Sequence, residues 1–125
     1  MGEQPDISNA EWQVMNAVWD GQPVTAGELI KVLGPANGWS AATVRTFLHR
    51  LVKKGALQFE QDGNRYLYSA AISRHRSVKQ ASRSFLSSVF GGETGSLVTH
   101  FVKSGKLTSE EIDELRRLLQ EKESR

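Results

Sequence analysis

The chain has 125 residues, no cysteine and a formal net charge of only +2 at pH 7. This length fits one domain, or a small domain with an appendage, and the lack of cysteine excludes disulfides and thiolate metal sites. The first residues lack the basic and apolar regions of a secretion signal, and no apolar run approaches the roughly 18 residues of a membrane span. We therefore expect a soluble protein of the cytoplasm, without membrane insertion.

The first part of the chain predicts two helices. Capping boxes that begin at Ser8 and Thr25 mark their starts. We expect these helices over about 9–19 and 26–33, the second one ended by Gly34-Pro35. The residues expected to face inward are Trp12, Met15, Val18 and Trp19 in the first helix and Leu29, Ile30 and Leu33 in the second.

A third helix is predicted between an N-cap at Ser40 and a C-terminal stop at Gly55. At about 100° per residue, its apolar residues fall within an arc of roughly 140°. These residues are Val44, Phe47, Leu48, Leu51 and Val52. The remaining arc has no acid and carries Thr43, Arg45, Thr46, His49, Arg50, Lys53 and Lys54. On this stretch alone, a solvated basic face on an ordinary amphipathic helix is the alternative interpretation.

A β-hairpin is predicted next, because apolar and polar residues alternate on both sides of Asp62-Gly63-Asn64. Three helices and a hairpin make a winged helix-turn-helix, so we expect residues 1–71 to be mainly α with a small β-hairpin. This arrangement is used largely to set a helix in the DNA major groove. Arg65, near the hairpin tip, would then lie beside the phosphates. The candidate DNA contacts on and before the third helix are Ser40, Thr43, Arg45, Thr46, His49, Arg50 and Lys53.

Residues 72–125 predict three further helices, over about 73–90, from Thr94 to Gly105, and from Thr108 onward. A monomer offers few other residues against which the apolar side chains of these helices could be buried. A self-complementary dimer is the simplest solution, and a two-fold symmetric one would present two reading helices. The alternative is that these helices fold back on the N-terminal domain. The candidate dimerisation residues are Phe85, Leu86, Val89, Phe90, Leu97, Val98, Phe101, Ile112, Leu115 and Leu119.

The sequence contains no recognisable catalytic or cofactor motif. His49, His75 and His100 are scattered, and none has a neighbour at metal-ligand spacing. The glycine-containing stretch 91–95 lacks the lysine and the preceding strand of a P-loop. No nucleophile elbow or zinc-protease helix is present. We therefore expect neither an enzyme nor a bound metal or cofactor.

Four segments resemble the penicillinase-repressor (BlaI/MecI) family of bacterial transcription regulators. They are the stretches 8–19, 43–55, 66–69 and 85–92, and the resemblance runs from Ile7 to about Gln120. The specific parts are Glu11-Trp-x-Val-Met15 and Thr43-Val-Arg-Thr46. It implies a dimeric winged-helix repressor that binds a palindromic operator, typically built on TACA/TGTA half-sites. Within that pattern, Thr43, Arg45 and Thr46 match the segment that reads bases, and Arg50, Lys53, Arg65 and Tyr66 match the region that contacts the DNA backbone.

The resemblance also bears on how the repressor is inactivated. Relatives in the β-lactam branch are cleaved in the short helix of the dimerisation region, commonly at an Asn-Phe bond, and the matching pair here is His100-Phe101. This implies a membrane-anchored sensor protease as a further partner, although the pair departs from the family pattern. Copper-responsive relatives use Cys-x-Cys motifs, which this chain lacks.

Three functions therefore remain open, and a sequence-specific repressor is the favoured one. The second is a winged-helix module that binds another protein, which acids or apolar side chains on the polar face of the third helix would support; neither is present. The third is a winged-helix regulator whose C-terminal part senses a small ligand, although nothing in that part suggests a polar-lined pocket.

Overall fold

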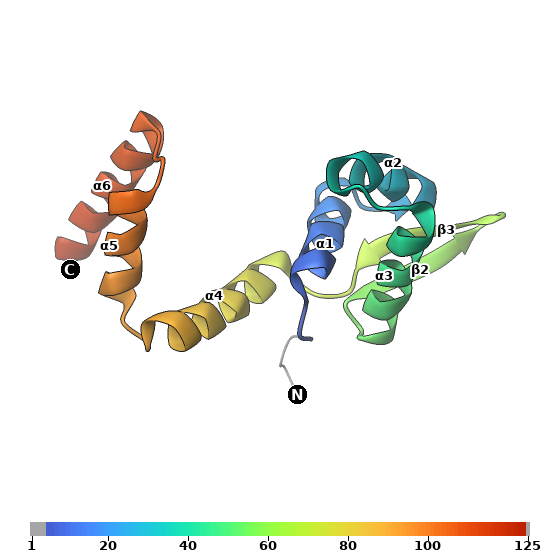
Figure 1. Cartoon of the computed structure of the whole chain (residues 1–125), viewed down its shortest axis with the longest axis horizontal. Helices are drawn as coiled ribbons and strands as arrows, with labels where there is room; N and C mark the ends of the chain where they lie inside the picture. Colours follow the sequence, from blue (N-terminus) through green and yellow to red (C-terminus); the bar gives the residue numbers. More distant parts are fainter. Residues whose placement is uncertain (1–4, 125) are drawn as a thin grey trace. The chain divides into compact units, whose positions relative to one another are not determined.

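The computed structural model describes residues 5–124 and contains six helices and three strands in that range. In chain order they are α1 (Asn9–Gly21), β1 (Val24–Thr25), α2 (Ala26–Asn37), α3 (Ala41–Lys53), β2 (Leu57–Asp62), β3 (Arg65–Ala70), α4 (Arg74–Phe90), α5 (Thr94–Ser104) and α6 (Ser109–Glu123) (Figure 1). The chain forms two compact units that divide within α4, the first ending at Ala81 and the second beginning at Ser82. The predicted fold class, mainly α with a winged helix-turn-helix, is confirmed.

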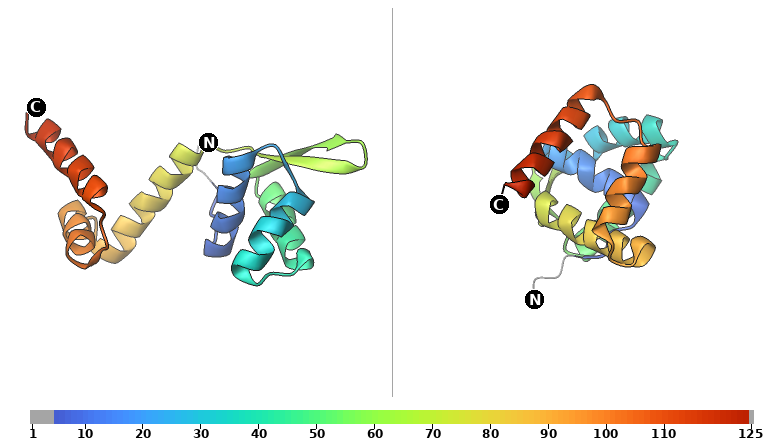
Figure 2. Two further views of the ribbon diagram at one scale, coloured as in Figure 1. Left: turned by 90° about the horizontal axis from the view of Figure 1, so that it is seen from above. Right: turned by 90° about the vertical axis from the view of Figure 1, so that its left-hand side faces the viewer.

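The first unit combines α1, α2 and α3 with an antiparallel sheet in the order β1-β3-β2. The predicted hairpin is present: Asp62 pairs with Arg65, and Gly63 adopts a positive φ of 65° in the two-residue turn. Figure 2 shows the hairpin reaching beyond the helices as a wing. The strand β1 was not predicted, because two residues are too short to show an alternating pattern.

The core of the first unit is made of apolar side chains from all three helices and the sheet. These are Val14, Met15 and Val18 of α1, Leu29 and Leu33 of α2, Val44, Leu48 and Leu51 of α3, together with Val24, Ala56 and Leu57. Trp19 and Ile30 pack at its edge. Trp12 was predicted to face inward, but it is only half-buried and contacts the ring of Trp19, because the buried side of α1 is centred on Val14 and Val18.

The second helix is longer than predicted. α2 continues through Pro35 to Asn37 and ends where Gly38 adopts a left-handed backbone conformation with φ 69°. The prediction that Gly34-Pro35 ends this helix is therefore wrong. A proline disfavours a helix in part because its ring clashes with the Cβ of the preceding residue, and Gly34 has no Cβ. The Trp39 N–H donates to the Gly34 carbonyl at 3.1 Å and closes the final turn.

The start of α4 is held on α1 by polar contacts within the first unit. The indole Nε1–H of Trp19 donates to the Ile72 carbonyl at 3.2 Å. Arg74 forms an ion pair with Asp20 at 2.9 Å and donates to the Asn16 side chain at 3.2 Å. The Arg74 guanidinium also lies over the Trp19 ring, 5.3 Å from its centroid.

The second unit comprises the end of α4 with α5 and α6, and no residue from 82 to 124 is buried. Thr108 and Glu111 form the capping box that starts α6. An apolar groove of about 410 Å³ runs between α5 and α6 and is lined chiefly by Val98, Val102, Leu107, Ile112, Leu115, Leu118 and Leu119. Among the described residues, no helix is long and apolar enough to cross a bilayer.

Candidate DNA-binding interface

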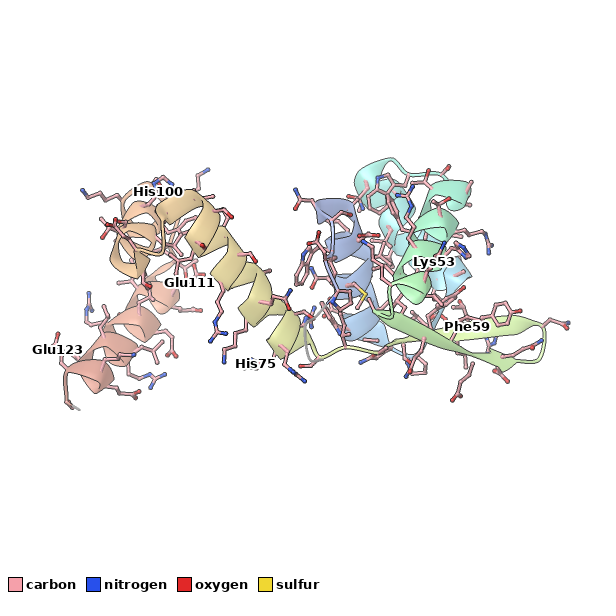
Figure 3. The ribbon with its side chains drawn as sticks, turned by 90° about the horizontal axis from the view of Figure 1, so that it is seen from below. Lys53, Phe59, His75, His100, Glu111 and Glu123 are labelled. Carbon is pink, nitrogen blue, oxygen red and sulfur yellow. The ribbon has the colours of Figure 1, made fainter. Side chains whose placement is uncertain are left out.

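Helix α3 has an apolar side and a polar side. Val44, Leu48 and Leu51 are buried in the core and attach the helix to the rest of the first unit. The opposite side is open to solvent, and its exposed residues are Arg45, Thr46, His49, Arg50 and Lys53. Figure 3 shows Lys53 on α3 and Phe59 on the adjoining hairpin.

Hydrogen bonds fix the hydroxyl groups at the start of α3. The Ser40 Oγ accepts from the Thr43 N–H at 3.1 Å and lies 3.0 Å from the Thr43 Oγ1. The Thr46 hydroxyl donates to the Ala42 carbonyl at 3.0 Å. Thr46 is exposed and its hydroxyl oxygen can still accept a hydrogen bond, so it can meet a base edge. Ser40 acts first as the helix cap.

A tilted pair of aromatic rings lies beside the polar face of α3. The ring centroids of Trp39 and Phe47 are 5.0 Å apart. The guanidinium carbon of Arg50 lies 5.9 Å from the centroid of Phe47. This cation–π contact restricts the rotamers of Arg50 and leaves its N–H groups available to an anion.

A polar cleft of about 300 Å³ adjoins α3. One wall is the first turn of α2, the other is the wing, and Arg45 reaches in from α3. The lining residues are Thr25, Ala26, Gly27, Arg45, Asn64, Arg65, Tyr66 and Tyr68. Backbone N–H groups at a helix start and arginine side chains both favour a negatively charged ligand. A cleft of this composition suits an oxyanion such as a phosphate.

The pKa of Tyr68, one of the two tyrosines that line the cleft, responds both to burial and to a charged neighbour. Burial raises the pKa of the Tyr68 hydroxyl, while the positive charge of Arg45 acts in the opposite direction. Tyr68 therefore stays a neutral hydrogen-bonding group at physiological pH. Arg45, predicted as a base-reading residue, thus also lines the cleft.

The wing presents an aromatic face and a separate acidic one. Phe59 lies opposite Tyr68 across the hairpin, and its ring is 4.8 Å from that of Tyr66. Side chains alternate between the two faces of a strand, so Glu60 and Asp62 lie on the face away from this aromatic group. Arg65 forms an ion pair with Asp62 at 3.2 Å. Both partners are exposed, so this pair is weak and Arg65 can exchange it for a phosphate.

Sequence reasoning missed two kinds of residue in this region. Thr25, Gly27 and Tyr68 line the cleft, but only the pairing of β1 with β3 brings them there. Lys54 was placed on the polar arc of α3, whereas its ammonium group turns away and pairs with Glu11 of α1. The capping box at Thr25 predicted where α2 starts, but it could not predict which residues lie next to Thr25 in the folded chain.

The model of the penicillinase repressor family matches residues 7–121. The chain belongs to this family. The penicillinase repressor of Bacillus licheniformis is 36% identical over 125 residues, which cover all of this chain and 98% of that protein. The methicillin resistance regulatory protein MecI of Staphylococcus aureus (strain N315) is 34% identical over 117 residues, covering 94% of this chain and 95% of that protein. The penicillinase repressor family is one of repressors and not of enzymes.

Solved structures agree with this membership. The DNA-binding domain of the repressor BlaI matches 61% of this chain and 93% of that chain, with 37% identity and a TM-score of 0.55. Monomeric Bacillus licheniformis BlaI, solved in complex with the blaP half-operator, matches with 37% identity and a TM-score of 0.54. MarR of E. coli has 22% identity and a TM-score of 0.54 over 93% of this chain, which supports the fold alone. The penicillinase repressor fold of this chain is thus a DNA-binding winged helix.

The remaining residues singled out in the sequence lie in the second unit. Of the candidate dimerisation residues, Leu86, Phe90, Leu97 and Leu115 are half-buried, and the other six are exposed. His100 and Phe101 are neighbours within α5, and the His100 ring lies 6.0 Å from that of Phe90. Across residues 5–124, no group of three His, Cys, Asp or Glu side chains could hold a metal ion.

Proposed function

We propose that this member of the penicillinase repressor family represses transcription as a homodimer on a palindromic operator of TACA/TGTA half-sites. The single observation that carries the proposal is the acid-free polar face of α3, which adjoins a cleft suited to an anion. In a symmetric dimer, two such helices would enter successive major grooves about 34 Å apart. BlaI is similar to this chain and was solved in complex with a half-operator, which supports DNA rather than a protein partner as the ligand.

Base reading would come from Thr43, Arg45 and Thr46. A guanidinium can donate two parallel hydrogen bonds to a guanine, a contact worth about 1–3 kcal/mol of discrimination. Ser40 and His49 flank this segment, on the turn before it and the turn after it. Backbone contacts would come from the cations around it and from the wing: Arg50, Lys53, Arg65 and Tyr66.

The cleft would receive one backbone phosphate. Ala26 and Gly27 in the first turn of α2 line it, and Gly27 leaves room there because it has no side chain. Such contacts fix the register of the protein on the duplex without reading sequence. Helix α3 and the cleft would therefore act together: α3 would select the base sequence, and the cleft would fix the position of the protein on the duplex.

The second unit would supply the dimer contact and the switch. Its exposed apolar residues would be covered by a second copy in the cytoplasm, where the operator is. Cleavage at His100-Phe101 by a membrane-anchored sensor protease would inactivate the repressor. Both residues lie inside α5, so this helix would have to open locally before a protease could bind an extended segment.

Gel shifts on a palindromic TACA/TGTA duplex and on a scrambled duplex test the proposal. We expect Arg45→Ala to relax the sequence preference, and Lys53→Ala to weaken binding to both duplexes alike and to make it less dependent on salt. Sedimentation at micromolar concentration tests the dimer. A chain that is monomeric there, or that binds both duplexes equally, would contradict this function.

A further inference from the structure

A buried carboxylate lies behind the proposed reading helix. Glu11 of α1 is only 2% exposed. Part of its role is local, because it accepts from the Ser8 N–H at 2.9 Å in the capping box. One backbone hydrogen bond does not compensate a buried negative charge. The charge of Glu11 therefore needs a second partner.

Lys54 is that partner, and it comes from the far end of α3. The residue follows the last turn of the helix and forms its C-cap. Its Nζ donates to the Glu11 carboxylate and, at 2.8 Å, to the Asp6 carbonyl. Burial alone would raise the pKa of Glu11, but the hydrogen bonds from Lys54 and Ser8 outweigh it and hold that pKa below its ordinary value. The Glu11 carboxylate is therefore charged at neutral pH.

This pair constrains α3 in a way that the core does not. Val44, Leu48 and Leu51 attach α3 through apolar contacts, which have little directional preference. A helix with side chains has a radius of about 5–6 Å, so a roll of about 10° displaces side-chain ends by about 1 Å. Binding sites need positions held within about 0.5 Å. An ammonium group fixed by two acceptors resists that roll.

We propose that Glu11 and Lys54 are positioning residues that hold α3 in the orientation in which Arg45 and Thr46 meet base edges. This inference rests on the proposed function. We assign Lys54 no phosphate contact, because Glu11 and the Asp6 carbonyl accept from two of its three ammonium N–H groups and the Glu11 carboxylate balances its charge. Both lysines are exposed, but Lys54 is paired with Glu11, whereas the charge of Lys53 is available to DNA.

Identical substitutions at the two adjacent lysines distinguish the roles in the full-length protein. Lys53→Met is expected to weaken binding to operator and scrambled duplexes alike, and to reduce the slope of log affinity against log salt by about 1. Lys54→Met is expected to reduce the ratio of operator to scrambled affinity by about tenfold, a part of what one base contact supplies. It should leave the salt slope on scrambled DNA unchanged.

Two more variants separate orientation from stability. Lys54→Met leaves a buried carboxylate unpaired, which can destabilise the fold. The double variant Glu11→Gln with Lys54→Met removes both charges and keeps an amide oxygen for the Ser8 N–H. We expect a melting temperature close to that of the wild type together with the reduced affinity ratio. Lys54→Arg keeps a positive donor for Glu11 and should keep the affinity ratio closer to that of the wild type than Lys54→Met does.

The affinity ratio of the folded double variant decides the inference. If that variant discriminates the operator as well as the wild type does, the pair only stabilises the fold and the inference is wrong. A shallower salt slope in Lys54→Met would also contradict it, since Lys54 would then be a phosphate contact. If the wild type itself binds the operator and the scrambled duplex equally, the proposed function is wrong, and the inference that rests on it is wrong too.

Discussion

The two units of the chain differ in where they keep their apolar side chains. The first buries eleven hydrophobic residues, from Val14 to Leu57, in one cluster. The second buries none over residues 82–124, and Phe85, Phe101 and Leu119 are among its exposed large residues. A packed core can maintain a structure without help, whereas a contiguous exposed apolar surface is typical of a site that associates.

This difference matches the two tasks in the proposed repressor. Reading a base sequence requires side chains fixed on a rigid support, and α3 has one in the core and in the pair of Glu11 with Lys54. Dimerisation requires a surface that is completed by a second copy. If the tasks are separate in this way, a change in one unit should leave the other unit intact.

Removal of the second unit should have the largest effect. A chain ended at Ala81 keeps the whole core, so we expect it to fold and to be monomeric. Its affinity for the palindromic duplex should fall by about 10²–10⁴-fold, because two linked binding units are replaced by one. Its affinity for a duplex with a single half-site should equal the affinity of the intact protein for the same duplex. Fluorescence anisotropy on full and half operators measures both, and loss of half-site binding would show that the first unit depends on the second.

Matched leucine truncations should have the next largest effect. Leu48→Ala opens a cavity in the core and should cost about 2–5 kcal/mol of the free energy of unfolding. Leu119 is 59% exposed, so Leu119→Ala should leave the unfolding of the first unit unchanged and weaken the dimer instead. Urea unfolding and sedimentation equilibrium measure the two effects. Equal losses of unfolding free energy would mean that the stability of the first unit depends on the second.

Local features of the first unit could be predicted from the sequence. Its capping boxes at Ser8 and Thr25 are present as expected, since each depends only on residues three positions apart. The hairpin turn at Gly63 is equally local. The continuation of α2 through Pro35 was missed, because the strong signal of a proline hid the permissive effect of Gly34 before it.

Features that depend on distant residues were not predictable. Helical periodicity gave the polar arc of α3, but it could not show that Lys54 leaves that arc to reach Glu11, 43 residues earlier. The cleft could not be predicted either, since Thr25 and Tyr68 meet only through the sheet pairing. The assignment of Arg45 to base reading and of His100-Phe101 to cleavage stays a prediction.

Acid should lower the stability of the first unit through Glu11. This should be the smallest of the predicted effects. The pKa of Glu11 is lowered in the folded protein, so its ionised form stabilises the fold above the unfolded pKa. That stabilisation is lost as the pH falls through the lowered folded value. The double variant Glu11→Gln with Lys54→Met should therefore lose less stability than the wild type as the pH falls below the ordinary carboxyl pKa of 4.5, and thermal melts at a series of pH values measure it.

A carboxylate of the second unit provides the control for this acid effect. Glu114 of α6 also has a lowered pKa, held by Arg117, but it is exposed and its ion pair contributes little. Glu114→Gln should therefore follow the wild type. If it changed the acid dependence of the first unit more than the double variant does, acid sensitivity would arise in the second unit, and the contrast between a self-supporting unit and a dependent one would be wrong.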